Sequence, residues 1–157
     1  MDPDHHRVIE HLLYRYADLI DAGDFAGLGQ LFAHGRIVSD GGIAAGAAAV
    51  QGLYESYTRR YECGTPRTQH LMSNVRIEVD PDRRGAAASL RFTVLQALPD
   101  FPLQAVIAGR YQDRFARDAQ GWHFQERRIQ PELIGDLSRH LLRPIPESAG
   151  ETRSDQA

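Results

Sequence analysis

A histidine and a carboxylate in this sequence have surroundings that suit proton transfer. His70 lies within residues 67–74, where a loop runs into a strand-like stretch, a position that suits a base lining a pocket. The ordinary pKa of an imidazole lies near neutrality, so the ring accepts and returns a proton when a carboxylate fixes its tautomer and steadies the imidazolium. Asp21, at the junction of two predicted helices, is the candidate carboxylate.

Other residue types that carry chemistry lack the spacing they need. His6, Glu10 and His11 lie close together on the first predicted helix, but Glu10 and His11 point about 100° apart around its axis, so three zinc ligands do not converge. Cys63 is the only cysteine and has no activating signature beside it, which is typical of a packing residue. The glycines form neither a phosphate-binding loop nor a nucleophile turn. We therefore expect no metal and no cofactor.

The composition is that of one ordinary globular domain. The chain has 157 residues, 42% hydrophobic and 25% charged, and its net charge of -3 provides no basic field to attract nucleic acid. A single cysteine agrees with a reducing compartment, and the N-terminus lacks the pattern of a signal peptide. The longest weakly polar run, 41–50, is too short to span a membrane. We expect a cytoplasmic domain over 1–143 and a disordered tail over 144–157.

The elements that must position the two residues begin with a pair of helices. Apolar residues recur at spacings of three and four over 5–22, which predicts an amphipathic helix. Gly23 can end this helix, and Asp24 can cap a second one that covers 25–32. Asp21 would then lie where the two helices meet.

The rest of the chain predicts mainly strands, because after Pro66 the apolar period changes to two. The expected elements are a strand over 35–40, a helix over 47–62, strands over 71–79, 86–98, 103–116 and 122–130, and a short helix over 133–142. Helices first and an antiparallel meander second indicate an α+β domain. Some strands are apolar on both faces, so we expect one face of the sheet to pack on the helices and the other on a second copy in a homodimer.

Several motifs resemble those of one known family. They are Tyr-x4-Asp (Tyr16, Asp21) followed by Gly-Asp-Phe, Thr-Gln-His at 68–70, Ser-Asn at 73–74, Gly-Arg-Tyr-x-Asp at 109–113, and Gly-Trp-x-Phe followed by Arg127. Over residues 5 to 131 the sequence resembles the SnoaL-like branch of the nuclear transport factor 2-like superfamily, which includes scytalone dehydratase, bile-acid 7-alpha-dehydratase and hexachlorocyclohexane dehydrochlorinase. The resemblance implies a cone-shaped fold of about three helices on a curved, mostly antiparallel sheet around a largely apolar pocket.

The resemblance also implies roles for particular residues. His70 would remove a carbon-bound proton, Asp21 would orient it, and Tyr16 with Arg127 would stabilise negative charge that develops on a substrate oxygen. We expect further substrate contacts from three residues: Tyr54, Thr93 and Asn74. The implied function is a cofactor-independent lyase or isomerase that acts on a small hydrophobic molecule such as a polyketide, steroid or terpenoid. A non-catalytic small-molecule binder or accessory protein of the same superfamily is the alternative.

One part of the dehydratase pattern is missing from the sequence. The related dehydratases carry a further Asp or His on the strand after the catalytic histidine. The corresponding stretch here, 90–96, offers only Thr93 and Gln96, and neither is a general acid. Proton abstraction is therefore better supported than dehydration, and an elimination with a better leaving group, an isomerisation or an aldol cyclisation stays open.

The periodicity alone leaves other interpretations open. A regular helix places Asp21 about 140° from Tyr16, so the carboxylate could cap or solvate the helix junction unless the helix ends earlier. His70 shares its strand parity with polar residues, so either the pocket face is mixed or a bulge near residues 73–74 switches the side. Tyr16 alone would fit a core position. Arg127 could instead pair with Glu126 or with an acid on a neighbouring strand.

Overall fold

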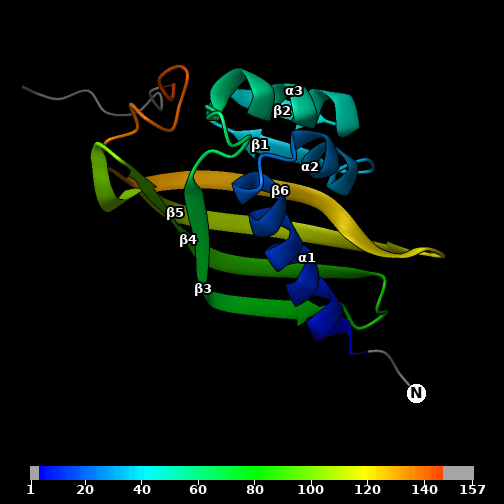
Figure 1. Ribbon diagram of the computed structural model, residues 1–157. Coiled ribbons are helices and arrows are strands. Elements are labelled where there is room, and N and C mark those ends of the chain that lie inside the picture. Colours follow the sequence, from blue (N-terminus) through cyan, green and yellow to red (C-terminus); the bar gives the residue numbers. More distant parts are fainter. Residues whose placement is uncertain (1–3, 147–157) are drawn as a thin grey trace, which may run out of the picture.

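The computed structural model describes residues 4–146, which fold as three helices on a six-stranded sheet (Figure 1). The elements are α1 (His5–Asp21), α2 (Phe25–Leu31), β1 (Arg36–Ser39), β2 (Gly42–Ala45), α3 (Ala47–Tyr57), β3 (Thr68–Val79), β4 (Gly85–Leu98), β5 (Phe101–Asp118) and β6 (Gly121–Ile134). Figure 1 shows α1 crossing one face of the curved sheet, with α2 and α3 beside the short strands β1 and β2. The predicted α+β class is confirmed.

Local sequence explains where the first two helices begin and end. Asp4 caps α1 by accepting a hydrogen bond from the backbone N–H of Arg7, and Asp24 caps α2 as predicted, accepting one from Gly27 at 2.8 Å. Gly23 ends α1 with a φ of +72°, and a side chain there would collide with the backbone oxygen of Gly64. The junction between the helices therefore requires glycine, and it fixes the direction in which the last turn of α1 faces.

The sheet has the order β2-β1-β6-β5-β4-β3, and every neighbouring pair is antiparallel except β1 with β6. Its inner face packs against α1 through a core rich in aromatic and branched residues. Four side chains of α1 are fully or almost fully buried there: Ile9, Leu13, Tyr16 and Ile20. The three-and-four spacing read from the sequence is thus the buried stripe of this helix.

A bulge in β3 determines which face of the sheet the His70 side chain occupies. The pairing of β3 with β4 shifts register between Ser73 and Arg76, and Asn74 has a φ of 53°. Before the bulge the half-buried side chains are at even positions, including His70, and after it they are at odd positions, including Val75. The predicted alternative, a bulge near residues 73–74 that moves the apolar side chains to the other face, is confirmed.

Two predicted elements need correction, and one strand was not predicted. The third helix ends at Tyr57 instead of running to residue 62, because Thr58 adopts an extended conformation and bridges to Leu141. Between the predicted strand over 35–40 and the third helix, the chain forms a strand that was not predicted, β2, which pairs with β1. The predicted helix over 133–142 is wrong, since β6 continues to Ile134 by pairing with β5 and the rest is a turn-containing segment.

The segment after β6, residues 135–146, packs back over the end of the sheet instead of forming a helix. The Arg139 side chain makes two hydrogen bonds to Asp100, and the backbone N–H of Arg59 donates to the carbonyl of His140 at 2.9 Å. Most of the tail that was predicted to be disordered, 147–157, lies outside the described residues. In the described part of the chain, no helix is long and apolar enough to cross a membrane.

Candidate active site

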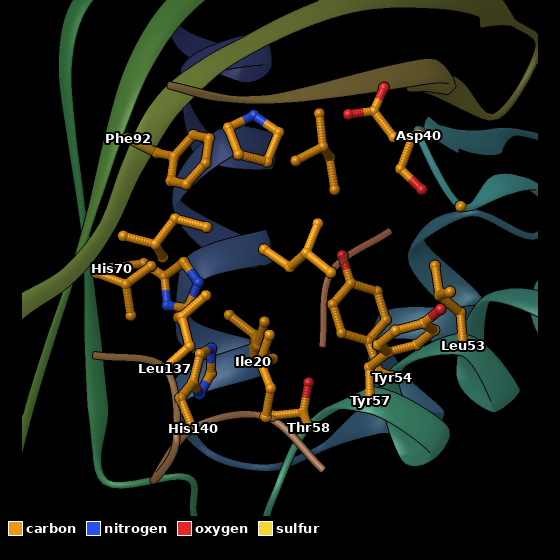
Figure 2. A pocket seen from close by; sticks show the side chains of 18 of the residues that line it. Ile20, Asp40, Leu53, Tyr54, Tyr57, Thr58, His70, Phe92, Leu137 and His140 are labelled. Carbon is orange, nitrogen blue, oxygen red and sulfur yellow. The ribbon is translucent and has the colours of Figure 1, made fainter. Parts of the chain in front are cut away.

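A mostly apolar pocket lies between the inner face of the sheet, helices α1 and α3, and the segment after β6 (Figure 2). Its volume is about 170 Å³. Ile20, Leu53, Phe92 and Leu137 supply part of the apolar lining, and the polar side chains include Asp40 at one side in Figure 2. An apolar pocket with a few convergent polar groups is the usual form of a small-molecule site.

The two residues first singled out meet at the wall of this pocket. His70 Nδ1 lies 2.6 Å from Asp21 Oδ1, and the backbone N–H of His70 donates to Asp21 Oδ2 at 2.7 Å. The Thr68 hydroxyl also donates to Asp21 Oδ1, at 2.9 Å. The His70 side chain is only 4% exposed. With Nδ1–H donated to the carboxylate, Nε2 carries the lone pair that can accept a proton.

Helix α1 and strand β3 place this pair jointly. Asp21 is the last residue of α1, so the helix does not end before it, and its carboxylate reaches over the first residues of β3. Although Asp21 lies about 140° from Tyr16 around the helix axis, its carboxylate therefore does not point to solvent. The rings of Tyr16 and His70 lie in edge contact, 6.4 Å between centroids, so the carboxylate and the tyrosine both lie next to one imidazole despite the offset. Neither helical phase nor strand parity contains this information.

Tyr16 and Tyr54 form a hydroxyl pair inside the pocket. Their hydroxyl oxygens lie 2.5 Å apart, and both residues are among the pocket lining. Burial, reinforced by Tyr16, raises the pKa of Tyr54 well above its ordinary value, so its hydroxyl stays protonated. Tyr111, which also lines the pocket, is hydrogen-bonded to Tyr16 as well, so the three hydroxyls use two hydrogens among themselves and have one that can be donated to an oxygen of a ligand.

Arg127 is fully buried beneath these tyrosines and is not among the residues that line the pocket. It pairs with Asp113 on the neighbouring strand through two hydrogen bonds, 2.9 Å from Nε and 2.7 Å from Nη2. Its guanidinium carbon lies 4.2 Å from the Tyr16 ring centroid and 3.8 Å from that of Tyr111. Burial alone would lower the pKa of Arg127, but the Asp113 carboxylate raises it above the ordinary value. The prediction that Arg127 contacts the substrate directly is therefore wrong. Its cation is packed behind the tyrosines.

The structure does not bring Thr93 and Asn74 to the pocket. Thr93 lies between Phe92 and Val94, which both line the cavity, so strand alternation directs it to the opposite face of the sheet. Asn74 is exposed and occupies the bulge of β3. Gln96, the other polar candidate on β4, is buried and donates to the backbone oxygens of Pro66 and Arg139.

Sequence reasoning missed His140. It lies in the segment after β6, lines the pocket and is 5% exposed. The sequence holds no signal for it, because the segment has no regular period and contacts the site only through the tertiary fold. Within residues 4–146, no three side chains of His, Cys, Asp or Glu are grouped to hold a metal ion.

The fold and the site together define a class of protein: α+β domains in which helices and a curved sheet surround an apolar pocket that carries an Asp–His pair. The chain belongs to the SnoaL-like domain family, which matches residues 4–128. The family expected from the motifs is thereby confirmed. No curated protein matches the sequence.

Solved structures share the same architecture. An NTF2-like protein with a cystatin-like fold from Novosphingobium aromaticivorans superposes with a TM-score of 0.68 at 21% identity, over 80% of each chain. LinA has a TM-score of 0.67 at 17% identity, covering 85% of this chain and 89% of its own. ActVI-ORFA from Streptomyces coelicolor has a TM-score of 0.68 at 17% identity, covering 81% and 97%. At these identities the likeness establishes the NTF2-like fold.

Proposed function

We propose that this protein is a cofactor-independent lyase or isomerase that removes a carbon-bound proton from a small hydrophobic substrate. The observation that carries the proposal is the 2.6 Å contact between His70 Nδ1 and Asp21 Oδ1 at the wall of an apolar pocket. A carboxylate on Nδ1 leaves Nε2 as the base and stabilises the imidazolium that forms. The SnoaL-like domain and the likeness to LinA, a hexachlorocyclohexane dehydrochlorinase, support the same class.

The reaction begins when His70 Nε2 takes a proton from a carbon next to a carbonyl group. The C–H bond breaks, the proton moves to the imidazole, and the electron pair moves into the carbonyl group to give an enolate. In an isomerisation the imidazolium returns the proton to a different carbon. In an elimination the electron pair forms a carbon–carbon double bond while the leaving group departs with its own pair, and the imidazolium then gives its proton to the departed group or to water. The Asp21 carboxylate balances the positive charge that develops on His70.

The tyrosine pair stabilises the oxygen that becomes negative. Tyr16, Tyr54 and Tyr111 use two hydroxyl hydrogens among themselves and have one left to donate, and donors aimed at a developing oxyanion contribute strongly to catalysis in a water-poor site. The Arg127 cation is packed against the Tyr16 ring in a cation–π contact, which helps to fix the position of the Tyr16 hydroxyl. Arg127 thus acts through the tyrosines rather than on the substrate.

The cavity limits the size of the substrate. About 170 Å³ is close to the roughly 150 Å³ cavity that takes up a benzene molecule. We therefore favour a molecule with one or two rings, at the small end of the polyketide, steroid and terpenoid classes considered from sequence. The hydrogen-bonded Asp21–His70 pair favours this enzyme over a non-catalytic binder, for which no ionic contact on the imidazole is needed.

Proton exchange tests the proposal without knowledge of the natural substrate. Acetophenone has one ring, one carbonyl group and an exchangeable methyl group, and its deuteration in heavy water is followed by proton NMR. We expect the protein to accelerate this exchange. His70→Ala and Asp21→Asn should each reduce the accelerated rate by at least about a hundredfold, the size of a general-base effect.

Two exposed residues of α1 provide matched controls, because Asp18→Asn and His11→Ala remove the same functional groups away from the pocket. Both should exchange at the wild-type rate. Circular dichroism and thermal unfolding establish that the four variants are folded. Exchange at the wild-type rate in both His70→Ala and Asp21→Asn would contradict the proposed mechanism.

A further inference from the structure

His140 places a second imidazole in the pocket, and the mechanism above does not use it. The residue belongs to the segment after β6, and only 5% of its surface is exposed. Figure 2 shows its ring on the same side of the cavity as His70, near Leu137. The two imidazoles are close enough for the charge of His70 to act on His140.

The imidazole of His140 is not needed to hold its segment in place. The backbone does this: the carbonyl of His140 accepts from Arg59 N–H at 2.9 Å, and its N–H donates to Leu137 at 3.1 Å. The neighbouring carbonyl of Arg139 accepts from Gln96 and from the Tyr61 hydroxyl. An apolar side chain at position 140 would satisfy all these contacts equally well.

The ring nitrogens of His140 identify its tautomer. Nδ1 is buried and has no hydrogen-bond partner among the described residues, whereas Nε2 is not one of the buried, unpartnered atoms. A buried N–H without an acceptor is rarer and more costly than a buried lone pair. The proton therefore belongs on Nε2. His70 is the opposite case, because its Nδ1–H is held by Asp21 and its Nε2 is the acceptor.

His140 is also uncharged at neutral pH. Burial, together with the nearby His70, lowers its pKa to about 4, and Asp21 offsets this only in part. A neutral imidazole of lowered pKa polarises a carbonyl oxygen by donating a hydrogen bond, without competing with the base for a proton. The pocket thus holds one imidazole suited to accept a proton and one suited to donate a hydrogen bond.

We propose that His140 is a substrate-binding catalytic residue whose Nε2–H donates to an oxygen of the substrate near the carbon that His70 deprotonates. This rests on the proposed function, and it narrows the substrate to a small ring compound with an acceptor oxygen, such as a carbonyl or phenolic oxygen. His140 would supply a hydrogen-bond donor that strand β4 lacks, since Thr93 lies on the outer face and the side-chain N–H groups of Gln96 already donate to the backbone oxygens of Pro66 and Arg139.

Binding of para-nitrophenol tests this role without turnover. The probe has one ring and one phenolic oxygen, and its affinity is measured by titration calorimetry. We expect His140→Phe, which keeps an aromatic ring but loses the donor, to weaken binding by about tenfold, the equivalent of one hydrogen bond. His140→Gln retains an N–H donor and should recover most of the loss. His11→Phe is the matched control and should bind like the wild type.

Heteronuclear NMR of the histidine ring nitrogens supplies a readout that a structural role would not change. The His140 signals should show a neutral ring with the proton on Nε2, and Nε2 should shift when para-nitrophenol binds. The inference is overturned if His140→Phe binds as tightly as the wild type, if the Nε2 signal does not move at saturation, or if the wild type binds no probe at millimolar concentration. Because acetophenone exchange tests His70 separately, the failure of either proposal can be recognised by itself.

Discussion

At the scale of single residues, the site depends on what each histidine touches. His70 and His140 line one cavity, yet Asp21 holds the first through Nδ1 while the second has no partner on Nδ1 among the described residues. In the proposed mechanism the same side chain therefore serves as a base in one position and as a neutral donor in the other. Histidine suits both tasks because its two nitrogens are distinct and its ordinary pKa is near neutrality.

The low pKa of His140 predicts a pH-dependent stability. Its pKa is about 4 in the folded protein and about 6.5 when unfolded, so between these values the unfolded chain binds more protons and folding weakens as the pH falls. The full difference corresponds to roughly 3 kcal/mol at about 1.4 kcal/mol per unit. We expect urea unfolding between pH 7 and 4.5 to show part of this loss in the wild type.

The variant His140→Phe isolates that contribution, because the other titrating groups that face position 140, His70 and Asp21, are unchanged. Its free energy of unfolding should fall less steeply over the same pH range. An identical slope in the two proteins would mean that His140 keeps an ordinary pKa in the folded state.

At the scale of the elements, the bulge in β3 brings His70 to the inner face. One extra residue shifts the side-chain alternation, so the strand is buried at even positions before the bulge and at odd positions after it. The cost is a left-handed backbone at Asn74, with φ of 53°. Asparagine tolerates this conformation better than other residues with a Cβ atom.

The bulge predicts how substitutions at Asn74 behave. Asn74→Val places a β-branched residue at positive φ and should lower the free energy of unfolding by about 1–2 kcal/mol, whereas Asn74→Gly should be neutral or slightly stabilising. Because the side chain is exposed, lost packing does not complicate the comparison. Chemical denaturation measures both values, and a valine variant as stable as the glycine variant would contradict the assigned backbone conformation.

At the scale of the whole molecule, the outer face of the sheet carries a row of four residues with a leucine at each end. Four residues pair directly across neighbouring strands and so share one face: Leu71, Thr93, Ala108 and Leu133. Leu133 is 71% exposed and Leu71 is 42% exposed. The two exposed leucines of this row agree with the homodimer that the sequence predicts, since exposed apolar side chains on one face favour association. Thr93 would then serve an interface instead of the substrate.

A charge in this row should separate the subunits. We expect the wild type to sediment as a dimer in analytical ultracentrifugation and Leu133→Glu to sediment as a folded monomer, because a carboxylate at an interface core is strongly disfavoured. Val8→Glu changes an exposed apolar residue of α1 in the same way and should stay dimeric. A monomeric wild type would rule out the sheet-face dimer.

Much of the fold could be predicted from local sequence. The three-and-four period marked α1, Asp24 marked the cap of α2, and the period of two marked the long strands. These signals are readable because backbone geometry alone sets their spacing. The short β2 strand and the segment after β6 were not predicted, because partner strands and packing, rather than their own composition, determine their conformation.

The sequence alone also indicated Asp21 and His70 as a pair, but through motif resemblance rather than periodicity. Only the tertiary structure joined them, since 49 positions separate the two residues and the end of a helix must lie over the start of a strand. It likewise placed Arg127 on Asp113 behind the tyrosines and brought His140 into the pocket. Burial and proximity determine a side chain's proton and partners, and both arise only when distant segments pack together.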